Sequence, residues 1–334
     1  MTTERLDAIY ILGDGLFEKI YGPDEQRDIA ARVNVLAPPY NAETVMRHPE
    51  ILRRADIILS SWGLPLLDAA FLAAAPRLKA VFYGAGSVKG FVTDAFWDRA
   101  IALCSAWGAN GVPVSEFTLA AILFSLKHAF RMNRTYCGTQ AGPKDRAVPG
   151  AYGTTVGLVS LGMIGRLVCE RLRPFDVKVL AYDPFIKPAD AAQLGVTLVP
   201  LDVLFRECDV VSLHTPWLKE TEGLITGALF SSMKPGATFI NTARGAVVCE
   251  TEMIDVLKRR PDLSAVLDVT YPEPPVADSP LFTLPNVFLT PHIAGSMDNE
   301  CRRMGRYMVE ELDRYLAGRP LAWQIDKAKA ALLA

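Results

Sequence analysis

One of the four histidines in this chain, His292, lies in the stretch LTPHIAGS, after a strand-like run and shortly before Gly295. An imidazole titrates near neutral pH, so a histidine in such a turn can give a proton to a substrate or remove one. A histidine beside a strand can equally be a packing residue. Its immediate neighbours do not decide between these roles, so other residues of the chain must.

A glycine-containing turn in the middle of the chain has the residue pattern of a nucleotide site. In Thr155–Gly165, TVGLVSLGMIG, a strand-like run leads into Gly162 and Gly165, and the next apolar residues recur with a helical period. The N–H groups at the positive end of that helix would face a pyrophosphate. Gly162 would let the backbone approach it, and Gly165 would let helix and strand pack closely. Ser160 stands where the fingerprint GxGxxG has its first glycine, so an ordinary strand-to-helix turn is the alternative.

An acidic residue supports the nucleotide interpretation. Asp183 ends the next strand-like run, KVLAY. A carboxylate at this place can accept hydrogen bonds from both ribose hydroxyls, whereas it would repel a 2′-phosphate. A surface aspartate that opens the turn DPF is the alternative. Together the two features predict NAD rather than NADP as the cofactor.

Short strand-like runs that alternate with helical patterns surround these residues along the whole chain. Strands spaced by helices in this way are typical of parallel, doubly wound sheets. The first series of expected strands comprises Ala8–Leu12, Val33–Leu36, Asp56–Leu59, Lys79–Phe82 and Ile101–Cys104. The second comprises Thr155–Leu161, Lys178–Tyr182, Val196–Val199, Asp209–Leu213, Thr238–Asn241, Ala265–Val269 and Val287–Leu289. Two such series predict two α/β domains.

Helical patterns and one expected linker complete the outline. The expected helices include Ala42–Ala55, Leu67–Ala75, the mostly apolar Glu116–Met132, and Met297–Leu316 with an apolar stripe at i, i+3/i+4 spacing. The stretch Gly138–Gly153 is rich in Gly and Pro and has no apolar period, which is typical of a linker. It is either a domain boundary or an arm between subunits, and the sequence leaves both open.

Composition restricts the class of protein. The 334 residues are 50% apolar and 22% charged, with a net charge of −2. This predicts about two globular domains, without the basic surplus of nucleic-acid-binding proteins. No uninterrupted apolar run approaches ~18 residues, so no membrane span is expected. The six cysteines are scattered without zinc spacing, and the N-terminus lacks the signal-peptide pattern. Both features favour a cytoplasmic protein with reduced thiols and no metal site.

An ordered set of motifs resembles that of the D-isomer-specific 2-hydroxyacid dehydrogenases. The motifs are Thr155–Gly165, YDP at Tyr182–Pro184, DVVSLHTP at Asp209–Pro216, NTARG at Asn241–Gly245, LDVTYPEP at Leu267–Pro274 and LTPHIAGS at Leu289–Ser296. The set covers nearly the whole chain and is far more specific than any single motif. The resemblance implies an NAD-dependent oxidoreductase that interconverts a small D-2-hydroxy acid and its 2-oxo acid.

By this resemblance the catalytic residues are Arg244, Glu273 and His292. Arg244 can bind the substrate carboxylate as a planar fork and polarise the carbonyl. His292 as imidazolium can protonate the developing alkoxide, and the neutral ring can remove that proton in the reverse direction. Glu273 can hold the ring and favour its charged form. The cofactor supplies the hydride.

The resemblance also assigns positions to ligand binding. His214 matches a residue on the nicotinamide side of the cofactor pocket, and Asp268 matches one that contacts the carboxamide. The expected NAD contacts are Gly162, Met163, Ile164, Gly165, Asp183, His214, Thr215, Pro216, Thr242, Ala243, Arg244, Asp268, His292 and Gly295. The expected substrate contacts are Gly84, Ala85 and Gly86 in AVFYGAGSVKG, whose backbone amides would bind the carboxylate, with Arg244 and His292.

Several positions depart from the family pattern or have a plainer explanation. A simple strand-to-helix turn is the alternative for the loop at Gly84–Gly86. Trp107 stands where relatives often have proline, which puts the shape of the substrate pocket in doubt, and Cys249 stands where aspartate is frequent. His48 and His128 are expected to be structural.

The domain arrangement follows from the resemblance. A flavodoxin-like substrate-binding domain, residues 1–110 and 298–334, would receive an inserted Rossmann NAD-binding domain, residues 111–297. The active site would lie in the cleft between them, and Met297–Leu316 would return to pack on the first domain. A homodimer is expected.

A non-enzymatic NAD(H)-sensing scaffold is the alternative from a different functional class. The C-terminal-binding protein corepressors share this fold and keep the three catalytic residues, but they carry additional peptide-binding surfaces and long tails, and no such tail is evident here. Formate dehydrogenases have glutamine where this chain has Glu273, which disfavours that activity.

Overall fold

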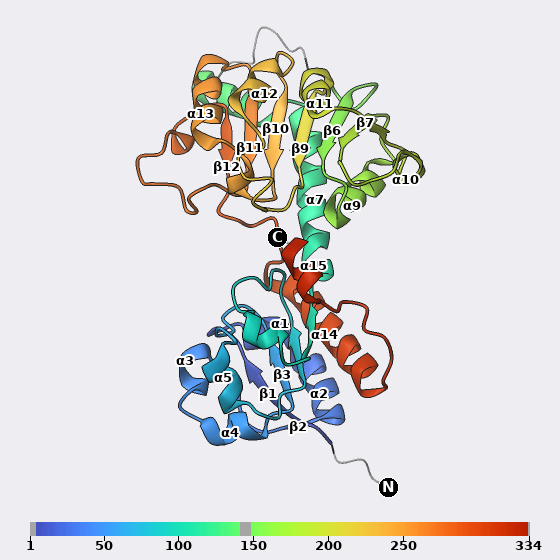
Figure 1. Ribbon diagram of the computed structural model, residues 1–334. Coiled ribbons are helices and arrows are strands. Elements are labelled where there is room, and N and C mark those ends of the chain that lie inside the picture. The colour runs from blue at the N-terminus through green and yellow to red at the C-terminus, as the bar shows by residue number, and fades with distance from the viewer. Residues whose placement is uncertain (1–4, 141–147, 333–334) are drawn as a thin grey trace. The chain divides into compact units, whose positions relative to one another are not determined.

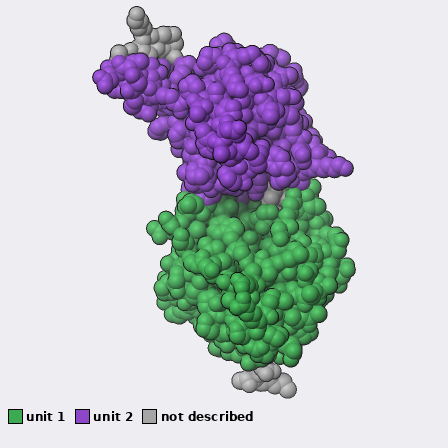
Figure 2. Space-filling model, turned by 90° about the vertical axis from the view of Figure 1, so that its left-hand side faces the viewer, with its two compact units in different colours: residues 1–111, 296–333 green, residues 112–295, 334 purple. Residues whose placement is uncertain are grey.

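The computed structural model describes residues 5–140 and 148–332, which form two compact units (Figure 1, Figure 2). Unit 1 takes its described residues from 1–111 and 296–333, and unit 2 takes them from 112–295. Unit 1 is therefore built from two separate stretches of chain. The centre of the predicted linker Gly138–Gly153, residues 141–147, lies outside the described residues.

Unit 1 contains a five-stranded parallel sheet in the order β2-β1-β3-β4-β5. Its strands are β1 (Asp7–Ile11), β2 (Asn34–Val35), β3 (Ile57–Ser60), β4 (Ala80–Tyr83) and β5 (Ala102–Ser105). Ile9 pairs with Ile58, which pairs with Val81, so apolar side chains align on one face of the sheet. This is the flavodoxin-like order, and each expected strand of the first series is present within one or two residues.

Helices cover both faces of the sheet in unit 1 (Figure 1). Their buried side chains form two apolar cores with alternate residues of the strands, as a doubly wound sheet requires. One core is covered by α3 (Ala42–Val45), α4 (Pro49–Arg54), α5 (Ala69–Ala74), α6 (Asp94–Trp97) and α15 (Lys327–Leu332). The other is covered by α1 (Phe17–Ile20), α2 (Pro23–Arg32) and α14 (Cys301–Leu316), which the 3-10 turn η3 (Asp298–Glu300) precedes.

Unit 2 contains a seven-stranded parallel sheet in the order β12-β11-β10-β9-β6-β7-β8. The strands are β6 (Thr155–Val159), β7 (Lys178–Tyr182), β8 (Thr197–Leu198), β9 (Val210–Leu213), β10 (Thr238–Asn241), β11 (Ser264–Leu267) and β12 (Val287–Leu289). The order is that of a Rossmann sheet, in which the strands extend outward in both directions from β6 and β9. The predicted fold of two doubly wound parallel sheets is confirmed.

Two layers of helices enclose the sheet of unit 2. One core contains side chains of α11 (Leu201–Glu207), α12 (Gly227–Ser232) and α13 (Glu250–Arg259), together with the 3-10 turns η1 (Gly245–Val247) and η2 (Pro280–Phe282). The opposite core contains side chains of α7 (Trp107–Leu126), α8 (Ala129–Thr139), α9 (Met163–Leu172) and α10 (Pro188–Gln193). Alternate strand residues divide between the cores; Val159 packs in the first and Leu158 in the second.

Two predicted helices are broken in the structure. Ala42–Ala55 is divided because His48, which precedes Pro49, has a non-helical backbone, and Pro49 begins α4. The predicted Glu116–Met132 begins earlier, at Trp107, and ends at Leu126. His128 has a left-handed backbone, φ +49°, between α7 and α8, so it is not inside a helix as expected. No glycine or proline marks this break in the sequence.

Helix α7 is the only helix in the described ranges that is long and apolar enough to cross a membrane. The sequence did not lead us to expect such a helix, because Pro113, Ser115 and Glu116 interrupt its apolar run. Length and composition alone do not separate a membrane span from a core helix, and 56% of the most apolar stretch is buried within the protein. This burial is typical of a core helix.

The last long helix, α14, packs on the sheet and helices of unit 1. Met304, Met308 and Leu312 of α14 are fully buried against α1, α2 and the sheet. Arg306 adds ion pairs to Glu25 at 2.7 Å and Asp28 at 2.6 Å.

Candidate active site

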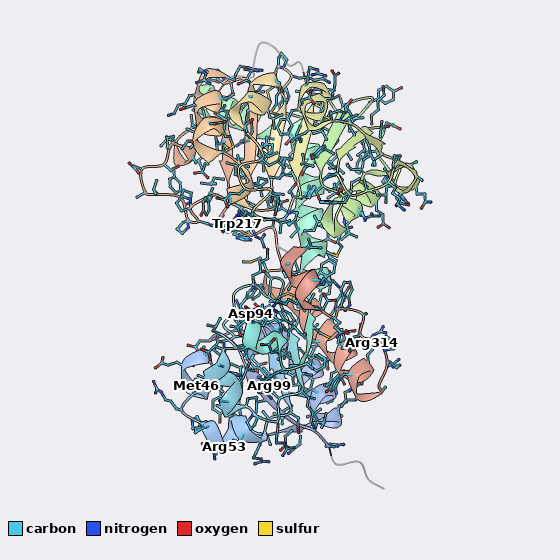
Figure 3. The ribbon with its side chains drawn as sticks, viewed as in Figure 1. Met46, Arg53, Asp94, Arg99, Trp217 and Arg314 are labelled. Carbon is cyan, nitrogen blue, oxygen red and sulfur yellow. The ribbon has the colours of Figure 1, made fainter. Side chains whose placement is uncertain are left out.

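The strand order of unit 2 reverses between β6 and β9. In open parallel sheets, ligands bind at such a switch point, beyond the carboxyl ends of the strands. Ser160–Gly165 follows β6 and His214–Pro216 follows β9, so both predicted cofactor segments meet there. Trp217 comes next and lies at the lower edge of unit 2 in Figure 3.

In the turn after β6, Ser160, Gly162 and Gly165 each have a different backbone or packing environment. Ser160 has φ +78°, a backbone conformation that normally favours glycine. Gly162 is the N-cap residue of α9, and a Cβ added there would meet no atom within 4 Å, which leaves space for a ligand. A Cβ at Gly165 would lie 2.3 Å from the Ser160 carbonyl oxygen, so the close packing of α9 requires glycine. Met163 and Ile164 begin α9, at its positive end.

The Asp183 carboxylate lies beside this turn. Its Oδ2 accepts the Leu161 N–H at 2.7 Å, and its Oδ1 accepts the N–H groups of Phe185 at 2.8 Å and Ile186 at 3.2 Å. These bonds fix the carboxylate between β6 and β7. The Ser160 hydroxyl is a fourth donor, to Oδ2, at the long distance of 3.5 Å. A carboxylate offers about four lone-pair sites, so a ribose hydroxyl would take the place of this weakest bond.

His214 faces the switch point with one unpaired nitrogen. Its Nε2 lies 3.1 Å from Ser212 Oγ, whereas its buried Nδ1 has no partner among the described residues. Burial lowers the pKa of His214 to about 4, so the ring is neutral near pH 7. An unpaired buried nitrogen beside an open glycine turn fits a bound dinucleotide. Thr215 is buried next to it, and the Pro216 carbonyl accepts the Thr221 hydroxyl at 2.6 Å.

The turn that carries Arg244 is held by Asn241, the last residue of β10. The buried Asn241 side chain accepts the Ala243 N–H at 3.0 Å and donates to the Arg244 carbonyl at 3.1 Å. Thr242 lies with its Oγ1 3.0 Å from the Oγ1 of Thr118 in α7. The backbone of NTARG is therefore fixed from within the motif and from α7.

A close backbone contact joins this turn to the segment after β11. A Cβ added at Gly245 would lie 2.0 Å from the carbonyl carbon of Thr270 and 2.6 Å from its Cα. Real Cβ atoms essentially never approach another atom closer than 3.0 Å, so only glycine fits. The contact sets the spacing between Arg244 and Glu273.

His292 and Glu273 form a direct pair, although they come from different motifs. His292 Nδ1 lies 2.5 Å from Glu273 Oε1. The two side chains are 48% and 38% exposed, so His292 is not a packing residue of the core. An ionised carboxylate can only accept, so Nδ1 carries the hydrogen and Nε2 is left for a ligand.

The turn that carries His292 is organised by Asp268, which is only 1% exposed. The carboxylate accepts the Thr290 hydroxyl at 2.6 Å and the N–H groups of Ile293 at 2.8 Å and Ala294 at 2.9 Å. The Asp268 carbonyl accepts the His292 N–H at 3.0 Å. These bonds stabilise a backbone in which His292 has φ +54°, a conformation that costs of order 1–3 kcal/mol. The predicted contact between Asp268 and the cofactor stays a prediction.

Arg244 lies within electrostatic range of Glu273. Burial lowers the pKa of Arg244, and the negative charge of Glu273 opposes this shift. The guanidinium Nη1 donates to the Ala243 carbonyl at 2.6 Å. The structure thus brings the three predicted catalytic side chains to one edge of unit 2, and Gly295 ends that unit.

Sequence reasoning missed Glu250, at the start of α13. Its Oε2 accepts the Tyr271 N–H at 3.0 Å, two residues before Glu273, and burial raises the pKa of Glu250. It therefore fixes the loop that carries Glu273. Glu250 follows the NTARG motif closely in the sequence, which could have drawn attention to it. Its contact with Tyr271, however, depends on how two distant loops approach each other.

The predicted substrate loop lies in unit 1, directly after β4. Gly84 and Ala85 are buried and Gly86 is partly exposed. The neighbouring Trp107 is packed edge-to-face against Trp323, with ring centroids 5.4 Å apart. Trp107 therefore has a packing partner within the unit.

Comparison with known proteins supports one family. The family model described as "D-isomer specific 2-hydroxyacid dehydrogenase, NAD binding domain" matches residues 119–294. A D-3-phosphoglycerate dehydrogenase of Mycobacterium bovis is 36% identical over 262 residues, which are 75% of this chain and 48% of that protein. This chain therefore spans about half the length of the first curated relatives that it matches.

Two other relatives are similar over most of their own length. An (S)-sulfolactate dehydrogenase of Chromohalobacter salexigens is 35% identical over 277 residues, which are 80% of this chain and 89% of that protein. The apo crystal structure of D-mandelate dehydrogenase from Rhodotorula graminis has a TM-score of 0.80 at 26% identity, covering 97% of this chain and 98% of that one.

Proposed function

Because the chain belongs to the D-isomer-specific 2-hydroxyacid dehydrogenase family, we propose that it interconverts a small D-2-hydroxy acid and its 2-oxo acid with NAD as the cofactor. The observation that carries this proposal is the contact of 2.5 Å between His292 and Glu273, beside the turn that presents Arg244. A proton donor, a cation and a carboxylate are the groups that reduction of a 2-oxo acid needs.

His292 is proposed as the acid in 2-oxo acid reduction. Its Nδ1–H is held by Glu273, which fixes the ring and stabilises the imidazolium, while Nε2–H points to the substrate carbonyl oxygen. NADH, when bound, supplies the hydride to the carbonyl carbon. His292 gives its Nε2 proton to the resulting alkoxide, and in the oxidative direction the neutral ring takes the hydroxyl proton back.

Arg244 is proposed to bind the substrate. A guanidinium can pair with the carboxylate through two parallel N–H groups and polarise the 2-oxo group with another. Asn241 and the Gly245 contact keep this side chain next to Glu273. Gly84, Ala85 and Gly86 are proposed to bind the same carboxylate through backbone N–H groups.

Each unit is proposed to bind one of the two ligands. Residues 111–297 would bind NAD, through Gly162, Asp183, His214 and the other positions predicted for the cofactor. Residues 1–110 and 298–334 would bind the substrate. Preference for NAD over NADP rests on Asp183, which would repel a 2′-phosphate.

Assembly and location are also proposals. A cytoplasmic homodimer is supported by Tyr136 of α8, which is 60% exposed, and by six cysteines that form no disulfide. Sedimentation of the purified chain tests the oligomeric state: a dimer is expected, and a monomer at micromolar concentration would refute it.

The test of function is NADH oxidation with a panel of 2-oxo acids. The panel contains glyoxylate, pyruvate, hydroxypyruvate and phenylpyruvate, with 3-sulfopyruvate and 3-phosphohydroxypyruvate added because of the names of two relatives. Turnover of at least one acid is expected, faster with NADH than with NADPH. No turnover of any acid, together with stoichiometric capture of protein partners, would favour the scaffold.

Variants connect turnover to the proposed residues. Arg244→Ala and His292→Ala should each lower kcat/KM by about 10²–10⁴-fold and leave NADH binding measurable. His48→Ala is a matched control, because His48 is also exposed and pairs through Nδ1 with a glutamate, Glu50, at 3.1 Å. A His48→Ala enzyme with the same loss would show that the effect is not specific.

A further inference from the structure

Two buried serines hold the carbonyl groups of the loop after β4. Ser61 Oγ donates to the Gly84 carbonyl at 2.9 Å. Ser105 Oγ shares its hydrogen between the Ala85 carbonyl at 2.8 Å and the Gly86 carbonyl at 2.5 Å. Both serines are 0% exposed. Three consecutive carbonyls are thus turned inward by hydroxyls that come from the ends of β3 and β5.

The N–H groups of the same loop are used differently. Gly84 N–H donates to Ser60 and Ala85 N–H donates to Tyr83, both within the sheet edge. The next three N–H groups, those of Gly86, Ser87 and Val88, donate to no acceptor within the described ranges. Gly86 and Ser87 are partly exposed, so a ligand can reach them. Consecutive backbone N–H groups without a protein acceptor can form a concave site for an anion.

The serines themselves have fixed positions. Ser105 ends β5, and its own N–H donates to the Trp323 carbonyl at 3.2 Å in the C-terminal segment. Ser61 follows β3 directly, and Ser60 next to it donates to the Ile11 carbonyl at 2.5 Å. Neither Ser61 nor Ser105 has a free surface, so their hydroxyls act on a ligand only through the loop.

We propose that Ser105 is a positioning residue for the substrate, because it holds the Ala85 and Gly86 carbonyls inward and so presents the N–H groups of Gly86 and Ser87 to the substrate carboxylate. This inference rests on the proposed function of the loop. The carbonyl of one residue and the N–H of the next lie in one peptide plane, so the Ser105 hydroxyl sets the direction of the Gly86 and Ser87 N–H groups. Ser61 holds only the plane of the Ala85 N–H, which already donates to Tyr83. A loop that is ordered before binding does not lose conformational freedom when the carboxylate arrives.

The effect should appear in substrate affinity and not in cofactor affinity. The Ser105 hydroxyl contributes about one net hydrogen bond to the orientation of the loop. Ser105→Ala should therefore raise KM for the best 2-oxo acid about fivefold to tenfold. The inhibition constant of oxamate, an unreactive analogue with the same carboxylate, should rise in parallel. kcat and the Kd for NADH should stay within about twofold.

Ser60→Ala is the matched control. Ser60 is also 0% exposed, and its hydroxyl shares its hydrogen between the Ile11 and Ser61 carbonyls at the same sheet edge. It contacts no carbonyl of Gly84–Gly86. Its KM and oxamate inhibition constant should stay within about twofold of the wild type, whatever stability it loses. Ser61→Ala is a second control with the same expected result, because the peptide that Ser61 holds carries the Ala85 N–H, which is already bonded within the sheet. Thermal melting shows that each variant is folded. Ser105→Cys, whose thiol is a weaker donor, replaces Ser105→Ala if that variant does not fold.

Two results would refute the positioning role, and a third would refute the proposed function. A folded Ser105→Ala enzyme with wild-type KM and oxamate inhibition would refute the positioning role. An equal rise of KM in Ser60→Ala would attribute the effect to general loss of packing and refute it as well. A wild-type chain without turnover of any 2-oxo acid would refute the proposed function itself, which is a distinguishable outcome.

Discussion

Replacement of Gly245 by alanine tests how the backbone positions the catalytic set. The added Cβ would lie 2.0 Å from the carbonyl carbon and 2.1 Å from the carbonyl oxygen of Thr270. Both are backbone atoms, so no side-chain rotation relieves the overlap. The NTARG turn and the segment after β11 must separate by about 1 Å, and a misplacement of that size can cost about 10²-fold in rate.

The expected result for Gly245→Ala is therefore a fall of about 10²-fold in kcat/KM, with a loss of about 1–3 kcal/mol of stability from overpacking. Steady-state NADH oxidation and thermal melting measure the two effects. Gly138→Ala in α8 is the control, because a Cβ there meets no atom within 4 Å. A Gly245→Ala enzyme that retains more than a third of wild-type kcat/KM would show that the separation of Arg244 from Glu273 does not matter.

Three further predictions concern residues around this set. Asp268→Asn weakens the acceptors for the 290–294 turn and should cost about 2–4 kcal/mol in unfolding free energy and at least about tenfold in kcat, measured by melting and NADH oxidation. An Asp268→Asn enzyme with unchanged kcat would show that Asp268 does not position His292 for the reaction. Asp183→Ala should raise the NADH Kd about tenfold and narrow the preference over NADPH, as fluorescence titration would show; an unaltered preference would exclude Asp183 as its cause. Burial lowers the pKa of His214 from 6.5 to about 4, so the folded state resists protonation and loses stability as pH falls through this range. His214→Gln should remove that loss, and identical melting-temperature slopes between about pH 7 and about pH 4.5 would contradict it.

The strands of both sheets could be predicted because each is a short apolar run bounded by turn residues. In unit 2, Lys178–Tyr182, Thr238–Asn241 and Val287–Leu289 have the expected limits. Helix ends were harder. Proline at position 49 divides one predicted helix, and His128 ends another in a left-handed conformation that only tertiary packing specifies.

The residues proposed for the site were chosen from motifs, whereas the contacts that support them could not be predicted. Glu273 and His292 come from different motifs and lie in direct contact. Glu250, Ser61 and Ser105 carry no recognisable pattern, because their partners are carbonyl or N–H groups of loops distant in the chain. These hydrogen bonds form where the ends of parallel strands meet at one edge of the sheet. The apolar periodicity of the sequence does not predict which side chains meet there.

The central claim is that Arg244 and His292 carry out the reduction of a 2-oxo acid while the dinucleotide is held by other residues. Its most direct test is the single-turnover rate of NADH oxidation by the Arg244→Ala/His292→Ala double variant, with NADH affinity measured on the same sample. NADH should bind within about threefold of wild type while the rate falls by at least about 10⁴-fold. A double variant that oxidises NADH at the wild-type rate would contradict the account.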